Sequence, residues 1–271
     1  MSSPTWTVAV PSFEPRPYRE EVWRVVESQN KSSTVRLTED LDDQALLEEL
    51  IDEVKPGFPA DCRDLNFLLA TPFRYAPYPN ASRFRRANSY PGVFYAAEHP
   101  MTAMTELAFY RMLFFHEAPG MVLPSRPVEH RVFSVLCETA RSLDLTQPPL
   151  SEAGDWTHPT DYAACHDLAD RARDEGIAVI RYQSVRDPLG RCVALLAPSA
   201  FAETEPRRLE TWHVFTRPAK VQVWREFPPL QREFDLAEFD ADPRVRDLLA
   251  PKEQAKGEPS DLPATPDPTA E

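Results

Sequence analysis

The sequence predicts an α+β fold, in which a central mixed or antiparallel sheet is flanked by helices. Short apolar segments with strand-like alternation, such as His130–Leu136, occur along the 271 residues together with segments of helical spacing, such as Glu39–Val54. The two kinds do not alternate strictly, as they would in a parallel α/β sheet. Hydrophobic residues make up 42% of the chain, which is enough to form a real core.

The N-terminal part predicts an arm, a first strand or short helix, and an amphipathic helix. Residues 1–17 contain several prolines and little pattern, which predicts an extended arm. Glu21–Glu27 predicts a strand or a short helix. Thr38 can cap a helix over Glu39–Val54, which a Pro-Gly pair ends. That helix carries apolar residues at helical spacing: Leu41, Ala45, Leu46 and Leu50.

The middle of the chain predicts a buried helix between strands. Val93–Ala97 predicts a strand. Pro100 suits the first turn of the next helix, which is predicted over Pro100–His116. This helix is apolar nearly all round, which is typical of a helix inside a core. Two further strands are predicted at His130–Leu136 and Ser142–Leu145.

The following segment predicts one more helix and two pairs of strands. Asp161 can cap a helix that runs to Glu175 and ends at Gly176. The predicted strands are Ile177–Tyr182 and Cys192–Leu196 around a turn at Pro188–Gly190, then a closing hairpin of Thr211–Phe215 and Lys220–Phe227.

These elements predict one folded domain over residues 18–230, with a helical extension over residues 231–250. Residues 251–271 are acidic and rich in proline. Such a tail buries too little apolar area to fold, so disorder is expected there.

Charge and cysteine usage argue against several classes of protein. The formal net charge of −13 argues against direct nucleic-acid binding, because nucleic-acid backbones recruit Lys and Arg. The four cysteines form no Cys-x-x-Cys pair, which favours reduced thiols and a cytoplasmic protein. We expect neither a secretory signal nor a membrane span, because no apolar stretch approaches the roughly 20 residues that cross a bilayer. The histidines and cysteines lack ligand spacing, so no metal site is predicted.

The stretch from Asn66 to Ala97 stands out on this acidic chain because it contains no Asp or Glu. It contains four arginines, which are Arg74, Arg83, Arg85 and Arg86. Aromatic residues are interleaved with them, among them Tyr75 and Tyr95. Guanidinium groups bind phosphate oxygens, and aromatic rings offer flat faces for a planar base. The stretch therefore predicts an anion site, although any one of these arginines alone fits a solvated loop better.

Glu106 lies within the predicted buried helix Pro100–His116, where an isolated carboxylate is costly. No basic residue lies three or four positions away on that helix, so its partner is expected from the arginine stretch. A structural Glu–Arg pair is an equally good interpretation of burial alone. Cations for phosphate, rings for a base and one placed carboxylate together favour an enzyme that cleaves a nucleotide N-glycosidic bond.

Ser184 follows a predicted strand within Tyr182–Asp187, where small hydroxyl residues often line a site but more often begin a turn. No Gly-x-Ser-x-Gly pattern surrounds it, so the sequence does not indicate an acyl-transfer nucleophile.

At these residues the chain resembles the RES-domain family, toxins of bacterial toxin–antitoxin pairs. The matching segments are Trp23-Arg24-Val25-Val26, Thr71–Tyr75, Ser82-Arg83-Phe84, Gly92–Tyr95, the helix leading to Glu106, Leu143–Thr146, Asp161-Tyr162 and Tyr182–Asp187. The resemblance spans roughly Tyr18 to Phe201. Several motifs occur in one order, which makes the resemblance fairly specific.

The resemblance implies the residues of the site. The Arg, Glu and Ser that name the family correspond to Arg83, Glu106 and Ser184, and Tyr95 corresponds to the family tyrosine. Arg74 and Tyr75 correspond to an upstream Arg-Tyr pair of the family, which implies that they bind the substrate. Two features depart from the family: Arg85-Arg86-Ala87-Asn88 replaces a glycine-rich loop, and Arg191-Cys192 follows Gly190 where relatives often have Asn.

The resemblance also implies a compact fold similar to ADP-ribosyltransferases and attack on NAD⁺, as substrate and not as cofactor, at the nicotinamide–ribose bond. Growth arrest would follow from NAD⁺ loss or from ADP-ribosylation. A helix-turn-helix (Xre-like) antitoxin is the implied protein partner, and a homodimer is expected.

On this hypothesis Arg83 and Arg74 grip the pyrophosphate, and Tyr75 or Tyr95 stacks on a ring. Glu106 holds a ribose hydroxyl and stabilises positive charge, and the serine positions nicotinamide or ribose. The alternatives are a transferase that modifies a protein, a nucleic-acid binding module that uses the Arg/aromatic stretch, and a scaffold that has lost catalysis.

Overall fold

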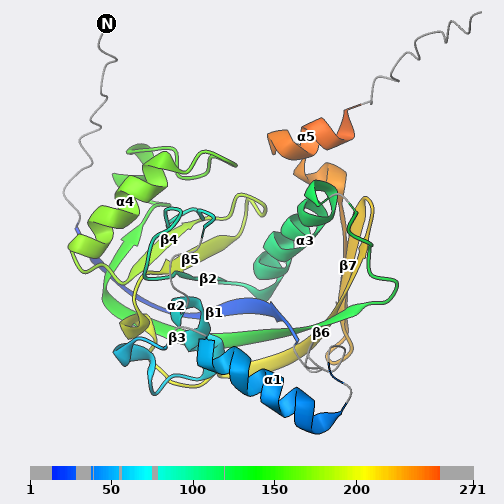
Figure 1. The fold of residues 1–271 in the computed structure, drawn as a ribbon. Coiled ribbons are helices and arrows are strands. Elements are labelled where there is room, and N and C mark those ends of the chain that lie inside the picture. The colour runs from blue at the N-terminus through cyan, green and yellow to red at the C-terminus, as the bar shows by residue number, and fades with distance from the viewer. Residues whose placement is uncertain are drawn as a thin grey trace, which may run out of the picture.

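The computed structural model describes residues 14–28, 38, 40–54, 57–74, 79–118 and 120–250. The predicted arm is described only from Glu14 onwards, and the predicted tail 251–271 lies outside the described residues. Over these ranges the chain forms a mixed sheet with helices on its faces, which confirms the predicted α+β class (Figure 1). No helix among these residues is long and apolar enough to span a membrane.

The sheet contains eight strands in the order β1-β2-β5-β4-β3-β6-β7-β8. Their bounds are β1 Arg16–Glu27, β2 Phe94–Ala97, β3 Val128–Asp144, β4 Val179–Gln183, β5 Arg191–Leu195, β6 Arg208–Arg217, β7 Lys220–Arg225 and β8 Leu230–Asp235. All neighbours are antiparallel except β3 and β4. Because β1 pairs with both β2 and β3, the strands β1, β2, β5, β4 and β3 form a closed circuit, and β6 to β8 extend from β3.

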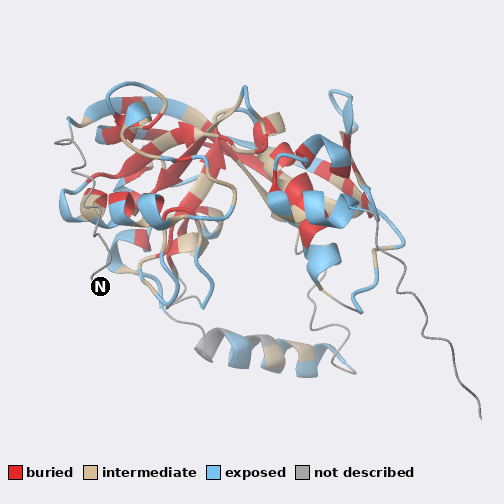
Figure 2. Ribbon diagram, turned by 90° about the horizontal axis from the view of Figure 1, so that it is seen from above, coloured by how far each residue is buried: buried red, intermediate tan, exposed pale blue. Residues whose placement is uncertain are grey.

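The helices cover different parts of this sheet. Their bounds are α1 Leu41–Val54, α2 Phe67–Arg74, α3 Pro100–Glu117, α4 Ala163–Asp174 and α5 Pro243–Leu249. Residues of α2 share one core with β1, β2 and β5, and α4 shares a second core with β4 and β5. Residues of α3 and α5 share the third core with β6, β7 and β8. Figure 2 shows the buried residues in two groups that the strands connect.

Alternate side chains of β1 enter different cores, because successive residues of a strand point to opposite faces. Val22 packs in the core that contains Phe94 and Phe133, whereas Trp23 packs in the core that contains Met104 of α3. Strand β1 therefore contributes to both cores, and its residues Trp23, Arg24 and Val25 also line the pocket described below.

Several predicted elements are confirmed, with small changes at their ends. Glu21–Glu27 is a strand, and Pro100 begins α3 after His99, whose Nδ1 accepts from the backbone N–H of Met101. Gly176 follows α4 with φ of +67°, the left-handed conformation that glycine adopts readily. The strands β4 and β5 and the hairpin β6–β7 are also as predicted.

Other predictions about elements are confirmed only in part. The predicted strands His130–Leu136 and Ser142–Leu145 belong to one strand, β3, because β1 pairs along nearly its whole length. The Arg/aromatic stretch Asn66–Ala97 includes the helix α2, whose Phe73 is fully buried. The helix α3 is buried on one face only, because Tyr110 and Phe114 remain about half exposed.

The predicted helical extension 231–250 is only partly helical and is not an appendage. Residues 230–235 form β8, which pairs with β7 along its length, and only α5 is an α-helix. Phe234 and Val245 are fully buried in the core under α3. The folded domain therefore continues past residue 230.

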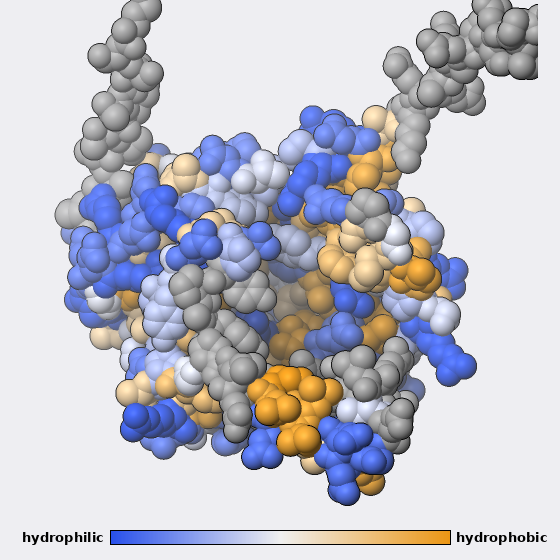
Figure 3. All heavy atoms as spheres, in the orientation of Figure 1, coloured by the Kyte–Doolittle hydropathy of each residue, from blue (hydrophilic) through white to orange (hydrophobic). Residues whose placement is uncertain are grey.

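The helix α1 forms where predicted but begins at Leu41, and Asp40 instead of Thr38 caps it: Asp40 Oδ1 accepts from the backbone N–H groups of Asp42 and Asp43. Its apolar side chains do not enter the core, because Leu41, Leu46 and Leu50 are 80%, 56% and 50% exposed. Figure 3 shows hydrophobic atoms gathered over this helix. Helical spacing thus predicted the helix correctly but not the packing of its apolar face.

Gly92 allows α2 to approach the segment that enters β2. A Cβ atom at Gly92 would lie 1.8 Å from the carbonyl oxygen of Pro72, a backbone atom that cannot rotate away. We expect Gly92→Ala to lower the free energy of unfolding by about 2 kcal/mol, since overpacking forces backbone shifts. Chemical denaturation measures this value. Gly57→Ala is the control, because nothing lies within 4 Å of a Cβ there, and equal effects of both changes would contradict the prediction.

Candidate active site

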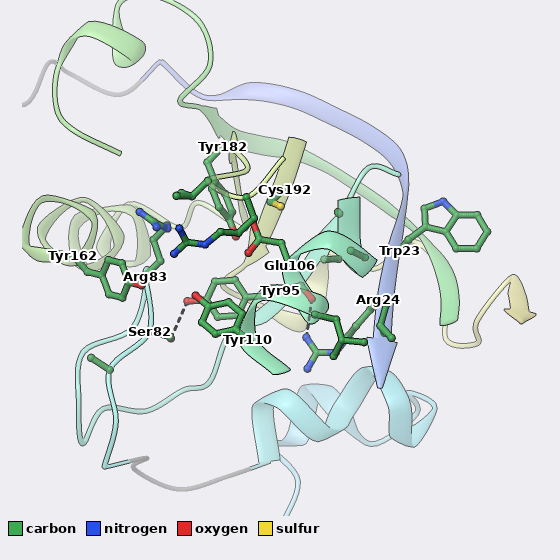
Figure 4. A pocket seen from close by; sticks show the side chains of 18 of the residues that line it. Trp23, Arg24, Ser82, Arg83, Tyr95, Glu106, Tyr110, Tyr162, Tyr182 and Cys192 are labelled. Atoms are coloured by element: carbon green, nitrogen blue, oxygen red, sulfur yellow. Dashed lines mark hydrogen bonds between the residues drawn. The ribbon is translucent and has the colours of Figure 1, made fainter. Parts of the chain in front are cut away.

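A pocket opens between α3, the strands β1 and β2, and the turn after β4 (Figure 4). Its volume is about 540 Å³, which fits a small-molecule ligand. Four arginines line it, which are Arg24, Arg83, Arg186 and Arg244. Four tyrosines line it as well, which are Tyr95, Tyr110, Tyr162 and Tyr182. Among the described residues of the wall, Glu106 is the single carboxylate.

Glu106 projects from α3 into this pocket (Figure 4). Its Oε1 accepts a hydrogen bond of 2.6 Å from Ser184 Oγ. Burial raises the pKa of Glu106 above its ordinary value, although the hydrogen bond from Ser184 and the charges of Arg186 and Arg83 oppose the shift. The carboxylate is thus fixed in direction, and the nearby arginines do not fully offset the cost of burying its charge. Both features are expected of a group that acts on a ligand.

Ser184 lies behind Glu106 and is buried, with 2% of its surface exposed. While its hydroxyl donates to Glu106, Ser184 Oγ accepts from the backbone N–H groups of Arg186 and Asp187 at 3.3 and 3.0 Å. The turn after β4 therefore fixes the serine, and the serine fixes the carboxylate. This geometry favours a residue that positions Glu106, whereas the sequence predicted a serine that positions nicotinamide or ribose.

Arg83 lies at the opposite side of the pocket from Arg24 (Figure 4) and is 8% exposed. Its Nη1 donates to the carbonyl oxygen of Trp156 at 2.8 Å and its Nη2 to that of His158 at 3.0 Å. The guanidinium also lies over the ring of Tyr162, 4.7 Å from the centroid. These two partners are backbone carbonyls, and no carboxylate among the described residues forms an ion pair with it, so its charge is available to a ligand.

Tyr95 connects the strand β2 to the loop that carries Arg83. Its hydroxyl is 2.9 Å from Ser82 Oγ and accepts from the backbone N–H of Phe84, also at 2.9 Å. Its carbonyl oxygen accepts from Arg24 Nη1 at 2.7 Å. Tyr95 therefore holds the arginine loop in place while its ring lines the pocket.

Arg24 is a partly exposed cation in the wall of the pocket, and its Nε atom is buried. Its guanidinium lies over the ring of Phe94, 4.8 Å from the centroid, and burial lowers its pKa to about 10. Its Nε has no hydrogen-bond partner among the described residues. A guanidinium with an unpaired donor in a pocket wall is suited to an anionic ligand.

The other predicted arginines do not join this pocket as a cluster. Arg85 Nη2 donates to the carbonyl oxygen of Asn80 on the surface. Arg86 forms ion pairs with Asp167 and Asp170 of α4, the second at 2.6 Å. The stretch contains no acidic residue, but α4 places two carboxylates next to its Arg86 in the folded protein.

The structure does not test the predicted substrate-binding pair, Arg74 and Tyr75. Arg74 is the last residue of α2, and its side chain lies outside the described residues, as does all of Tyr75. Their predicted roles stay predictions.

The sequence did not single out Arg186, Arg244, Tyr110 and Tyr162 as site residues, although all line the pocket. Arg24, Tyr162 and Arg186 lie inside the motifs quoted above, which was a usable signal. Arg244 had none, because it lies about 58 residues beyond Arg186 in a segment expected to be an appendage.

In the described ranges, no group of three or more His, Cys, Asp or Glu side chains could hold a metal ion. The four cysteines, all within those ranges, are buried free thiols. Cys192 lines the pocket, where burial raises the pKa of its thiol above the ordinary range.

Removal of the Ser184 hydroxyl tests its positioning role. We expect Ser184→Ala to lower kcat by about tenfold, since a hydrogen bond to a charged group is lost. The acidic limb of the pH profile should move to higher pH, because the hydrogen bond from Ser184 lowers the pKa of Glu106. Ser142→Ala is the matched control, a buried serine that donates to the carbonyl oxygen of Arg16. An unchanged pH profile in Ser184→Ala would contradict the role.

The fold and the pocket define an α+β protein with an arginine- and tyrosine-lined pocket around one glutamate. The sequence model of the RES domain matches residues 59–217, which is more than half of the chain. The chain therefore belongs to the RES domain family, as the sequence motifs predicted. Arg83, Tyr95, Glu106 and Ser184 all lie within the matched residues.

A search of solved structures finds a chain of the M. tuberculosis MbcT–MbcA toxin–antitoxin complex, at 12% sequence identity. The similarity covers 72% of this chain and 85% of that chain, with a TM-score of 0.41. None of the curated proteins compared with the chain matches it significantly.

Proposed function

We propose that this protein cleaves NAD⁺ at the bond between nicotinamide and ribose and acts as the toxin of a toxin–antitoxin pair. The single observation that carries the proposal is the convergence of Glu106, Arg83 and four tyrosines on one pocket of about 540 Å³. The family membership supports the same function through the resemblance described above. NAD⁺ is the substrate, and the proposal includes no cofactor.

The chemistry needs few groups from the protein. The C–N bond to nicotinamide breaks with its electron pair leaving on the ring nitrogen, which makes nicotinamide neutral and leaves an oxocarbenium-like ribose. Water or inorganic phosphate then donates an oxygen to the anomeric carbon and releases a proton when water attacks. A neutral leaving group needs no strong general acid, which fits a wall with one carboxylate.

Each side chain has a role that its geometry supports. Glu106, held by Ser184, would bind a ribose hydroxyl and stabilise the positive charge of the transition state. Arg83 would bind the pyrophosphate, because its guanidinium has no carboxylate partner among the described residues. The ring of Tyr95 would face the base or nicotinamide, since its hydroxyl is already engaged.

The proposal extends to the setting of the protein. A cytoplasmic toxin of this kind would be blocked by a helix-turn-helix antitoxin that covers the pocket, and a homodimer and an ADP-ribosyltransferase-like fold remain part of the same hypothesis. Transfer of ADP-ribose to a protein is the alternative that uses the same pocket, and direct nucleic-acid binding is disfavoured by the net charge of −13.

Incubation of the purified protein with NAD⁺, with and without inorganic phosphate, tests the activity. We expect release of free nicotinamide together with ADP-ribose, or with its phosphate when phosphate is the acceptor. Mass spectrometry of a cell extract supplied with labelled NAD⁺ distinguishes the alternative, in which label appears on protein. Salt-dependent binding of oligonucleotides without any loss of NAD⁺ would overturn the enzymatic proposal.

A further inference from the structure

The pocket is completed by a segment that lies outside the residues matched by the RES domain. Arg244 of α5 lines the pocket, although the matched residues end at position 217. The core under α3 holds this segment in place, since Phe239 and Val245 pack there with Phe109. The position of Arg244 is therefore set by tertiary packing, not by a loose end of the chain.

Asp242 fixes the direction of Arg244. Its Oδ1 accepts from Arg244 Nε at 3.1 Å, and its Oδ2 accepts from Arg244 Nη2 at 2.9 Å. The same Oδ2 lies 2.8 Å from Arg186 Nη2. Asp242 is 1% exposed, so one buried carboxylate lies between two guanidinium groups of the pocket wall.

Arg244 keeps donors for a ligand. Asp242 occupies the Nε and Nη2 side of its guanidinium, and Nη1 has no hydrogen-bond partner among the residues that the structure describes. About 30% of the side chain is exposed, whereas that of Arg186 is 4% exposed. The guanidinium also lies over the ring of Phe109, 5.4 Å from the centroid, which limits its movement.

The charges of the wall are unbalanced in favour of cations. Four arginines and Glu106 line the pocket, and Asp242 pairs with two of these arginines, which leaves an excess of two positive charges among these described groups. A diphosphate linkage between two nucleosides carries two negative charges at neutral pH. The excess positive charge therefore matches this class of ligand. Of the two arginines that pair with Asp242, Arg244 is more exposed than Arg186.

We propose that Arg244 is a substrate-binding residue that contacts the diphosphate of a dinucleotide, and that Asp242 positions it. This inference rests on the proposed function and extends it by assigning a binding role to the C-terminal segment. Arg186, buried and paired with the same carboxylate, then serves mainly to hold positive charge near Glu106.

The test compares Arg244→Ala, Arg244→Lys and Arg246→Ala in the full chain. Arg246 is the control, because it is an exposed arginine of the same helix whose Nε bonds the carbonyl oxygen of Asp240. For Arg244→Ala we expect KM for NAD⁺ to rise about tenfold while kcat changes less than about threefold, since a charge-assisted hydrogen bond to the substrate is lost. Arg244→Lys should recover part of the loss, and Arg246→Ala should leave both constants unchanged.

Binding of inorganic pyrophosphate, measured by calorimetry, tests the site without catalysis. We expect the affinity of Arg244→Ala to be about tenfold weaker than that of the unmodified chain. If nicotinamide is not released from NAD⁺ but pyrophosphate binding still depends on Arg244, the proposed function fails and the diphosphate site stands. Pyrophosphate affinity and KM that do not change in Arg244→Ala, or that change equally in Arg246→Ala, would overturn the inference, as would no binding of pyrophosphate at all.

Discussion

Glu106→Gln is expected to lower the rate of nicotinamide release from NAD⁺ by about 10²-fold or more, while the protein remains folded. The amide can still accept the hydrogen bond from Ser184, so the geometry of the wall is kept. What is lost is the negative charge that stabilises the oxocarbenium-like transition state. Initial rates at saturating NAD⁺ measure the effect. Glu117→Gln, an exposed residue at the end of the same helix, should retain normal activity.

The same substitution separates a functional carboxylate from a structural ion pair. Burial raises the pKa of Glu106 above the ordinary glutamate value of 4.5. A carboxyl group whose pKa is higher in the folded state favours folding when protonated, and this contribution is lost as the pH rises through the folded-state pKa. At neutral pH Glu106→Gln should therefore unfold at a higher temperature than the unmodified chain, and the difference should shrink as the pH falls towards 4.5.

Normal NAD⁺ turnover in Glu106→Gln would refute the catalytic role. Lower thermal stability of this variant at neutral pH would instead indicate that the carboxylate stabilises the fold through Arg83 or Arg186. The first result concerns function and the second concerns the pKa, so the two measurements are independent.

Phe234→Ala is expected to lower the free energy of unfolding by about 4 kcal/mol, the usual range for a fully buried phenylalanine. Phe234 of β8 is 0% exposed. Its ring stacks on the ring of Phe239 in the core under α3, with 6.5 Å between the ring centroids. Denaturation by urea measures the change. Phe227→Ala is the matched control, because that side chain is 91% exposed, and its effect should stay within about 0.5 kcal/mol.

The outcome for Phe234→Ala also tests the extent of the domain. A large loss of stability means that residues beyond position 230 fold together with the sheet, as β8 and its pairing with β7 indicate. An effect as small as that of Phe227→Ala would restore the boundary that the sequence suggested. Because Arg244 follows β8 in the same packed segment, a loosened core should also weaken substrate binding.

Much of the fold could be predicted from the sequence because helices and strands have local periodicities. The helix α3, the strands β4 and β5 and the hairpin β6–β7 were found in this way. The exposed leucines of α1 show where this reasoning stops, since spacing indicates an apolar face but not what covers it. The strand β8 was missed because its residues, Leu230–Asp235, are mostly exposed and polar.

The sequence by itself determined the α+β class, the family, and the placing of Glu106 on an apolar helix near arginines and tyrosines. Tertiary structure alone decided the role of each side chain: Arg83 enters the pocket, Arg86 pairs with α4, and Ser184 lies behind the carboxylate. It also brought Arg244 to the site from the far end of the chain. The physical reason is that secondary structure follows from neighbours along the chain. The direction and charge environment of a side chain depend instead on segments that meet only when the core packs.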